Sequence, residues 1–454
     1  MLTKNCSYEI EITGLTSEGM GVGRHGGVPI FVKGAAPGDV LTAKIIKAKK
    51  GYAYGRVESV IKCSGSRAVP VCPVYGKCGG CVLQHMNYDA QLAAKAAKVE
   101  DSLRRIGGFV GMCVDEIIAA SGAFRYRNKS VFPVGVDAGG RAVCGLYAAH
   151  SHRLVPVEDC HIAHEGVAEV LRAVEGCMAA YGVPVYNEVS HTGLVRHVMV
   201  RTAFATGQVM VVLVVNGDSL PRSDEITAKL RKIPSVRSVY LNINRARTNV
   251  IFGEQTHLIW GEPYIHEILC GVKFAISATS FFQVNPVMTE LIYGKALEFA
   301  GISPSSVVLD LYCGIGAISL IAARCAARVV GVEVSEAAVA DARANAVQNG
   351  ITGAEFVAGK VEDTLGELLA GGFQPDVVIL DPPRKGCDPA VIKALLCCGA
   401  KRIVYVSCDP ATLARDLKLL CESGLYCVAK VVAADAFPQT AHVESIVLLM
   451  KNSV

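Results

Sequence analysis

Two residues near the C-terminus combine side-chain types and positions that favour covalent chemistry. Cys408 follows a short apolar strand at residues 403–406 and precedes a helix that begins near residue 411. Open α/β sheets bind ligands at the carboxyl ends of their strands, and a helix N-terminus lowers the pKa of a nearby thiol. Glu444 directly precedes the apolar run 445–450. A carboxylate at this position is either a functional base or a surface residue at the end of a strand. This placement favours Cys408 as a nucleophile, although one cysteine among 18 is more often a core residue.

A glycine-rich turn earlier in the same region predicts a cofactor site. The apolar strand 307–311 runs into the turn 312–316, and a helix begins near Ala317. Such a turn lets the backbone approach a ligand closely, and Glu333, about 20 residues on, ends the next strand, where an acid can bind ribose hydroxyls. Asp310 gives the pattern D-x-x-x-G-x-G, which favours S-adenosylmethionine (SAM) over a dinucleotide. A dinucleotide site and a purely structural turn remain as alternatives.

A third strand end carries an acid followed by two prolines. Asp381-Pro382-Pro383-Arg384 ends the strand 377–381. Methyltransferases of exocyclic amines place an aromatic residue after Asp-Pro-Pro, and Arg384 stands there instead. The motif therefore argues against amine methylation, and a Pro-rich structural turn is the alternative.

A SAM site, a cysteine and a carboxylate together suit methylation at C5 of uracil. C5 is a poor nucleophile until a thiolate adds to C6 of the ring. A base must afterwards remove the C5 proton so that the thiolate can leave. Cys408 and Glu444 are the two residues that this scheme requires.

Six motifs occur in one order across the last third of the chain. They are Phe281-Phe282-Gln283-Val284-Asn285, Asp310-Leu311-Tyr312-Cys313-Gly314, Gly331-Val332-Glu333, Asp381-Pro382-Pro383-Arg384, Ser407-Cys408-Asp409-Pro410 and His442-Val443-Glu444. With them the chain resembles the RNA (uracil-5-)-methyltransferases of the 23S ribosomal RNA type. The resemblance implies that Cys408 is the nucleophile and Glu444 the base. It also implies SAM contacts from Gln283, Tyr312, Gly314, Glu333 and Asp381, whereas Ala317 replaces an Asn that some members carry.

A cysteine cluster lies in the first quarter of the chain. Cys72, Cys78 and Cys81 form C-x5-C-x2-C in a Gly-rich loop, a spacing that differs from the C-x3-C-x2-C of radical SAM enzymes. Three ligands need a fourth, and four thiolates suit either zinc or a [4Fe-4S] cluster. The resemblance implies Cys160 as the fourth ligand and favours the cluster. We do not expect the nearby Cys63 and His85 to be ligands.

The elements that position these residues fall into three groups. Short strands at 8–12, 28–32, 40–47 and 54–61 between glycine turns predict an OB-like barrel that resembles a TRAM domain. A helix is expected over 88–106, and the strands from 126 to about 276 predict an antiparallel α+β section. From about residue 304, apolar strands alternate with Ala- and Leu-rich helices, which predicts a doubly wound sheet of the class I methyltransferase type.

The predicted fold class is therefore α/β, with a Rossmann-like SAM-dependent methyltransferase domain, an N-terminal barrel and a central α+β domain. The expected boundaries are 1–63 for the barrel, 64–90 with 125–276 for the central domain and its cysteine cluster, and 91–124 with 277–454 for the methyltransferase domain.

Charge and hydropathy narrow the possible partners and locations. The net charge is only +4, but residues 1–70 hold ten Lys and Arg against five acids, an asymmetry typical of nucleic-acid-binding modules. Apolar runs such as 209–215 are too short to span a bilayer, and the polar start predicts no signal peptide. We expect a cytoplasmic, monomeric enzyme with no membrane contact. Arg125, Arg127 and Lys129 on a strand at 125–133 are candidate RNA contacts, with ordinary surface charge as the alternative.

The expected activity is SAM-dependent C5 methylation of a specific uridine in 23S rRNA through a covalent adduct of Cys408 with C6. Transfer RNA is an alternative substrate, although the barrel and the cysteine loop favour ribosomal RNA by resemblance. A non-catalytic RNA-binding or ribosome-assembly protein would need neither Cys408 nor Glu444. Cytosine C5 methylation usually uses a Pro-Cys motif, and Cys408 follows Ser407.

Overall fold

Alternating apolar residues in the last third of the chain build a sheet with helices on both faces. Val308 and Ile379 are buried in one helical layer, whereas their neighbours Leu309 and Val378 are buried in the other. This period of two is what a strand buried on both faces requires. The strands are β16 (Val307–Leu311), β17 (Arg328–Glu333), β18 (Ala354–Ala358), β19 (Val377–Leu380), β20 (Arg402–Ser407), β21 (Tyr426–Ala434) and β22 (Glu444–Lys451).

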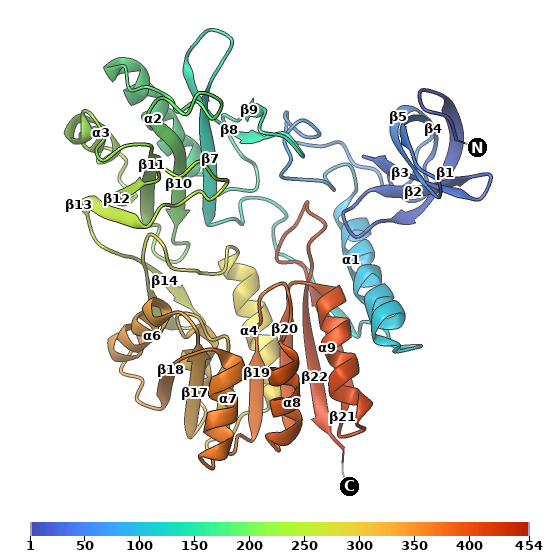
Figure 1. Cartoon of the computed structure of the whole chain (residues 1–454), viewed down its shortest axis with the longest axis vertical. Helices are drawn as coiled ribbons and strands as arrows, with labels where there is room; N and C mark the ends of the chain where they lie inside the picture. The colour runs from blue at the N-terminus through green and yellow to red at the C-terminus, as the bar shows by residue number, and fades with distance from the viewer. Residues whose placement is uncertain (1, 453–454) are drawn as a thin grey trace.

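The helices divide between the two faces in the manner of a doubly wound fold. In the computed structural model, which describes residues 2–452, side chains of α4, α5 and α6 pack on one face of the sheet, and side chains of α7, α8 and α9 pack on the other. Figure 1 shows α7, α8 and α9 on the near face. The bounds are α4 (Pro286–Ala300), α5 (Ala317–Ala322), α6 (Glu336–Gln348), α7 (Val361–Ala370), α8 (Pro389–Cys397) and α9 (Pro410–Glu422).

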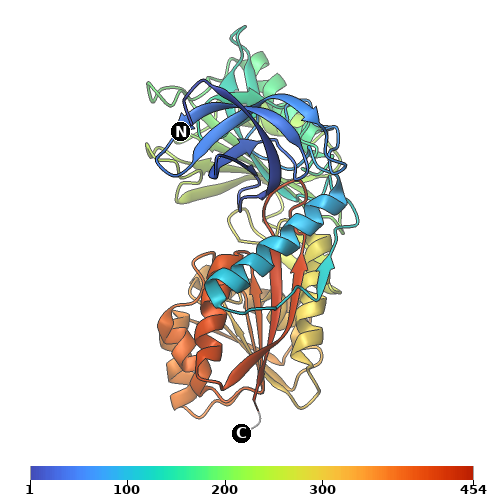
Figure 2. The ribbon, with the colours of Figure 1, turned by 90° about the vertical axis from the view of Figure 1, so that its right-hand side faces the viewer.

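A segment from the first quarter of the chain completes this sheet. Helix α1 (Tyr88–Ser102) starts at the N-cap Asn87 and continues into one π-helical turn at Leu103–Gly107. Strand β6 (Glu116–Ile118) then pairs in parallel with β21 at the sheet edge, giving the order β18-β17-β16-β19-β20-β22-β21-β6. Figure 2 shows α1 between the blue barrel and the C-terminal strands. The helix predicted over 88–106 is confirmed. The sequence did not indicate that its last turn is π-helical.

The N-terminal strands close into a small barrel, as predicted. Their order is β1-β2-β3-β5-β4, and Ile30, Leu41 and Ile45 are fully buried in its core. The strands are β1 (Ser7–Leu15), β2 (Gly21–His25), β3 (Val28–Lys33), β4 (Val40–Ala48) and β5 (Ala53–Lys62).

The central region forms a seven-stranded sheet, β13-β12-β11-β10-β7-β8-β9. Most neighbours are antiparallel, as predicted, but β11 and β12 are parallel because α3 crosses between them. The bounds are β7 (Lys129–Val136), β8 (Ala142–Tyr147), β9 (Leu154–Pro156), α2 (Val167–Tyr181), β10 (Val195–Thr202), β11 (Val209–Val215), α3 (Ser223–Leu230), β12 (Val236–Ile243) and β13 (Gln255–Gly261).

A two-stranded hairpin, β14 (Ile265–Leu269) and β15 (Val272–Ile276), links the central sheet to α4. Phe274 and Ile276 of this hairpin are buried in the same core as α4 and α6. The domain boundaries given above stay a prediction. Within residues 2–452, no helix is long and apolar enough to cross a membrane.

Candidate active site

A cavity of about 990 Å³ lies at the carboxyl ends of β16, β17, β19 and β20. All seven residues predicted for the cofactor and for catalysis line it, although they come from six separate segments. They are Gln283, Tyr312, Gly314, Glu333, Asp381, Cys408 and Glu444. The sequence motifs thus meet at one place, and the roles of the individual residues stay predictions.

The turn after β16 has a backbone that shapes one wall of this cavity. Tyr312, Gly314 and Gly316 all have positive φ angles, of 64°, 56° and 80°. A Cβ at Gly316 would lie 2.8 Å from the ring of Phe356, so this position requires glycine. The turn leaves the wall open for a ligand that packs against the backbone.

The carboxylate of Glu333 is held at the end of β17 by backbone amides. The N–H of Gly314 donates to Oε2 at 3.2 Å, and the N–H of Ser335 donates to Oε1 at 2.9 Å. Each oxygen keeps a free lone pair, because a carboxylate offers about four acceptor sites. Glu333 is therefore fixed, and it can still accept two hydroxyl groups such as those of a ribose.

Asp310 is buried beside the same turn. Its Oδ2 accepts a hydrogen bond of 2.5 Å from the hydroxyl of Ser319, whereas its Oδ1 has no partner among the residues that the structure describes. Burial, together with the nearby Asp381, raises the pKa of Asp310 to about 7. Asp310 does not line the cavity, so its carboxyl group supports the turn rather than a ligand. The site thus fits SAM at the ribose end, where Glu333 lies.

The sequence led us to expect a lowered pKa for the Cys408 thiol. In the structure its pKa is instead raised to about 11. Burial is the main cause, and the carboxyl groups of Glu444 and Asp381 add to it. The first amides of α9 do not act on the thiol, because they donate to the carboxylate of Asp409 at the N-cap. Arg384 opposes this shift, because its charge favours the thiolate.

Glu444 and Asp381 lie buried on the same cavity and influence each other. Burial raises the pKa of Glu444 to about 8, with Asp381 as a further cause and Arg384 opposing it. Burial also raises the pKa of Asp381 to about 7, although Gln283 donates to its Oδ2 at 3.3 Å. Both carboxyl groups are therefore partly protonated near neutral pH.

Several other residues line the cavity without having been assigned a role from the sequence. Arg384 and His442 belong to quoted motifs, and their place at strand ends was the available signal. Phe281 is 70% exposed at the cavity, an unusual position for a phenylalanine. Arg127, predicted as an RNA contact, also lines the cavity.

The other two predicted RNA contacts have structural surroundings that the sequence did not indicate. Arg125 and Lys129 were expected on one strand, but β7 begins only at Lys129, and Arg125 has a φ of 57°. Arg125 pairs with Asp159 and donates to the carbonyl of Cys160, so its charge serves the fold. Burial lowers the pKa of Lys129 to about 8.

The four predicted metal-binding cysteines line a second, smaller cavity. Cys72, Cys78, Cys81 and Cys160 surround it with apolar neighbours such as Val157. Burial raises the pKa of three of these thiols, and the neighbouring thiols contribute. In the described part of the chain, no three His, Cys, Asp or Glu side chains are grouped so that they could hold a metal ion. The four cysteines thus share a cavity, but they are not arranged around one metal position, and a metal centre stays a prediction.

The two residues excluded as ligands remain outside this cavity. His85 is buried, and its Nδ1 lies 2.7 Å from the hydroxyl of Tyr75. Cys63 is exposed.

Two family models match the chain. The model described as tRNA (Uracil-5-)-methyltransferase matches residues 241–452, which include every residue that we predicted for SAM and for catalysis. The TRAM domain model matches residues 4–57, within the closed barrel.

Relatives and a solved structure match almost the whole chain. An RNA methyltransferase of Halalkalibacterium halodurans, itself described as uncharacterized, is 45% identical over 99% of this chain and 98% of its own. A similarly described RNA methyltransferase of Clostridium tetani is 42% identical over 98% and 96%. The crystal structure of the Pyrococcus abyssi tRNA (uracil-54, C5)-methyltransferase with S-adenosyl-L-homocysteine matches with a TM-score of 0.80 and 29% identity, covering 97% of this chain and 99% of that one. The site, the two models and these full-length matches show that the chain belongs to the RNA (uracil-5-)-methyltransferase family and carries an N-terminal TRAM domain.

Proposed function

We propose that the protein methylates C5 of a specific uridine in 23S ribosomal RNA, with Cys408 as the nucleophile and Glu444 as the base. The observation that carries this proposal is that both side chains line one cavity with the residues expected to hold SAM. The target base must leave its stack to reach this cavity. One chain supplies both groups, so the proposed enzyme works as a monomer.

The proposed mechanism begins with the loss of a proton from Cys408. In the free site the thiol is protonated near neutral pH, because burial and two carboxyl groups raise its pKa. The thiol proton passes to solvent, Arg384 favours the thiolate, and the sulfur adds to C6 of the uracil. The added electron pair makes C5 nucleophilic, and bound SAM supplies the electrophilic methyl group.

Glu444 then removes the remaining C5 proton. Burial raises the pKa of Glu444 to about 8, so a minor fraction of this group is ionised at neutral pH, and that carboxylate is a stronger base than an ordinary glutamate. Loss of the proton restores the C5–C6 double bond and expels the Cys408 thiolate. Asp381, with a pKa raised to about 7, lies on the same cavity and can share the proton.

Transfer RNA is the second candidate substrate, because of one specific observation. The tRNA enzyme of Pyrococcus abyssi matches 97% of this chain with a TM-score of 0.80. The proposal of ribosomal RNA depends on the barrel and the cysteine loop, which the family resemblance associates with that substrate.

The test is methyl transfer from labelled SAM to unmodified RNA. Transcripts of 23S rRNA and of tRNA are offered to the same enzyme preparation, and the labelled position is mapped. Label at C5 of one uridine in 23S rRNA supports the proposal, whereas label only in tRNA selects the second candidate. Label on cytosine or on an exocyclic amine would refute both.

For the second cavity we propose a [4Fe-4S] cluster bound by Cys72, Cys78, Cys81 and Cys160. These four thiols share one largely apolar cavity. Four thiolates suit either zinc or a cluster, and the family resemblance favours the cluster. Iron and sulfide analysis of anaerobically purified protein decides between the two, since stoichiometric zinc in colourless protein would exclude the cluster.

A further inference from the structure

The loop that precedes Glu444 connects two strands of the C-terminal sheet. Residues 435–443 run from the end of β21 to the start of β22, and Ala434 pairs with Glu444 across the hairpin. Glu444 is the first residue of its strand, so the loop decides where its carboxylate lies. We call residues 435–443 the base loop.

The base loop has no regular secondary structure, and other parts of the chain hold it. Five of its carbonyl groups accept hydrogen bonds from outside the loop, at 2.8–3.0 Å. The donors are Asn285 to Ala436, Lys95 to Phe437, Tyr126 to Pro438, the N–H groups of Val82 and Leu83 to Gln439, and Lys98 to Ala441. Two of these five anchors come from helix α1, more than from any other helix.

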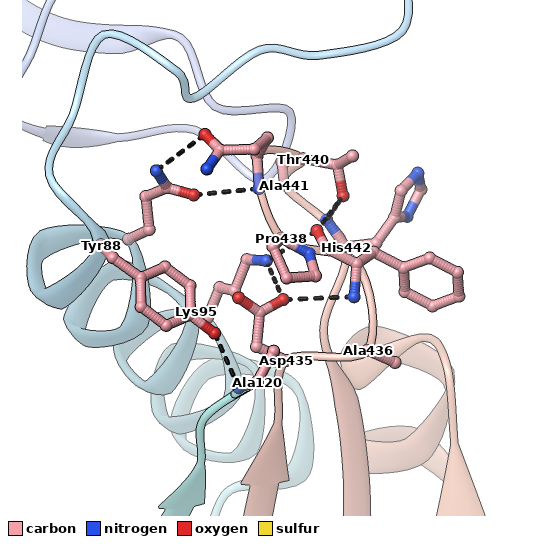
Figure 3. Close-up of polar contacts among 12 residues, drawn as sticks. Tyr88, Lys95, Ala120, Asp435, Ala436, Pro438, Thr440, Ala441 and His442 are labelled. Atoms are coloured by element: carbon pink, nitrogen blue, oxygen red, sulfur yellow. Dashed lines mark hydrogen bonds and ion pairs between the residues drawn. The ribbon is translucent and has the colours of Figure 1, made fainter. Parts of the chain in front are cut away.

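Lys95 makes the most buried of these contacts. Its side chain is 2% exposed, and its ammonium group forms an ion pair with Asp435, which is 0% exposed. The same ammonium group donates to the carbonyl of Phe437 at 3.0 Å, and the N–H of Phe437 donates to Asp435 at 3.2 Å. Figure 3 shows Lys95 pointing from α1 into the base loop toward Asp435. Lys95 therefore fixes both the first residue of the loop and the turn that follows.

Gln91, one helical turn earlier, holds the far side of the loop. Its Oε1 accepts from the N–H of Gln439 at 3.0 Å, and its Nε2 donates to the Oε1 of Gln439 at 3.1 Å. Gln439 has a φ of 69°, a backbone conformation that costs energy for a residue with a side chain. The paired amides offset that cost, so α1 also fixes the bend of the loop.

We infer that helix α1 is the positioning element for proton abstraction, and that Lys95 and Asp435 are positioning residues for Glu444. The inference rests on the proposed function, in which Glu444 is the base. The ammonium group of Lys95 contacts the loop on the side that faces α1. Glu444 and His442 line the cavity. Neither Lys95 nor Asp435 is among the residues that line that cavity, so they act through the loop.

This inference predicts a defect in one step of the reaction. Loosening the base loop leaves Cys408, Glu333 and the turn after β16 in place, because these belong to β16, β17 and β20 and their loops. Addition to C6 and methyl transfer then proceed, whereas removal of the C5 proton slows. A displacement of about 1 Å can cost up to roughly 10²-fold in rate, so we expect release of methylated RNA to slow roughly 10–100-fold.

The experiment follows single turnover with ordinary uridine RNA in the full-length protein. Lys95→Met should accumulate a methylated covalent RNA adduct, with SAM affinity and the yield of the 5-fluorouridine adduct unchanged. Glu444→Gln is the reference for a lost base. Lys295→Met is the matched control, since Lys295 is 19% exposed and pairs with Glu116 and Glu298, outside the base loop.

A second variant separates positioning from stability. Removing one partner of a buried ion pair leaves the other charge unpaired, and replacing both by apolar residues often restores stability. Lys95→Met with Asp435→Leu should therefore regain melting temperature relative to Lys95→Met and still accumulate the adduct, because the bond to Phe437 stays lost.

The outcomes distinguish the inference from the function on which it rests. Should Glu444→Gln release product normally, the base assignment of the proposed function fails. Should Glu444→Gln accumulate the adduct while the stable double variant releases product like Lys295→Met, only the role of α1 is refuted.

Discussion

Two regions of the molecule place cysteines beside a cavity, and the surroundings of the thiols differ. Cys408 shares its cavity with the carboxyl groups of Glu444 and Asp381 and with the guanidinium of Arg384. The four cysteines of the other cavity have apolar residues, Tyr75, Gln84 and His161 around them. Both regions contact the base loop, since Val82 and Leu83, directly after Cys81, donate to Gln439.

On the proposed function, the difference separates a thiol that would react from thiols that would bind a cluster. A nucleophile that must attack and leave needs a base and a cation close by, and Cys408 has both. Thiols among apolar groups and other thiols resist ionisation unless a metal replaces their protons. The charged residues next to a cysteine therefore indicate its chemical role better than the number of cysteines does.

The largest expected effect is on the reactive thiol. Cys408→Ala should abolish both methyl transfer and the covalent adduct with 5-fluorouridine RNA, because no other residue supplies the nucleophile. SAM affinity should stay within about twofold, a change smaller than the loss of one hydrogen bond. Equilibrium SAM binding and denaturing gels of the RNA adduct measure the two effects.

The matched control for that variant is Cys397→Ala, since Cys397 is exposed at the end of α8. The control should methylate RNA at the rate of the unchanged protein. If Cys408→Ala still methylated RNA, Cys408 would not be the nucleophile, and the proposed difference between the two cysteine regions would be wrong.

The second effect concerns the binding thiols. Cys81→Ala should lower the iron content from about four atoms per chain to well below that value, because a [4Fe-4S] cluster needs all its thiolates. Cys63→Ala, at an exposed cysteine, should keep full iron content. Iron and acid-labile sulfide are measured in anaerobic preparations. Equal iron in both variants would place the metal elsewhere.

A smaller effect is expected at the cofactor end of the reactive cavity. Glu333→Ala removes a carboxylate that two amides hold in place, and it should weaken SAM binding by about 1–3 kcal/mol. Isothermal titration measures this loss. Glu336→Ala, three residues on and exposed, is the control and should bind SAM normally. If folded Glu333→Ala bound SAM with unchanged affinity, the ribose would not bind at the end of β17.

The smallest effect is a pH dependence of stability. Because the pKa of Glu444 is about 8 in the fold and ordinarily 4.5, the folded protein holds a proton that the unfolded chain has released between these pH values. This group therefore stabilises the fold at low pH, and its contribution is lost as the pH rises to about 8. The melting temperature of Glu444→Gln should fall less between pH 5 and pH 8 than that of the unchanged protein.

Exposed Glu422 offers the control, and Glu422→Gln should keep the pH dependence of the unchanged protein. A Glu444→Gln profile that parallels the control would mean that the carboxyl of Glu444 is not desolvated.

The sequence predicted what depends on local pattern. The strands at 307–311 and 377–381, the barrel and the helix at 88 follow from alternation, glycine turns and caps, and the structure confirms them. The convergence of four motifs on one cavity could be predicted because β16, β17, β19 and β20 are parallel and end at the same edge. The motifs at 281–285 and 442–444 lead into α4 and the antiparallel β22, so strand direction did not predict their place. The domain boundaries and the residue roles remain predictions.

What the sequence missed depends on contacts between distant residues. The lowered thiol pKa expected for Cys408 was wrong because Asp409 takes up the amides of α9. The ion pair between Arg125 and Asp159 was also not indicated by the sequence, and the RNA contact of Arg125 stays a prediction. The bond between Gln91 and Gln439 spans 348 positions, and no periodicity indicates such a pair.

The pairing of β6 with β21 has a consequence for synthesis on the ribosome. Glu116 finds its partner Val432 only after more than 300 further residues have been made. The strands of the barrel are neighbours in the chain, so the barrel can fold while the rest is still being translated. The apolar residues of α1 and β6 stay exposed until β21 has been made. Such late closure is slow and exposes the nascent chain to aggregation. We therefore expect chaperone-dependent folding, and a fragment that starts at α4 should be insoluble because its β21 edge stays open.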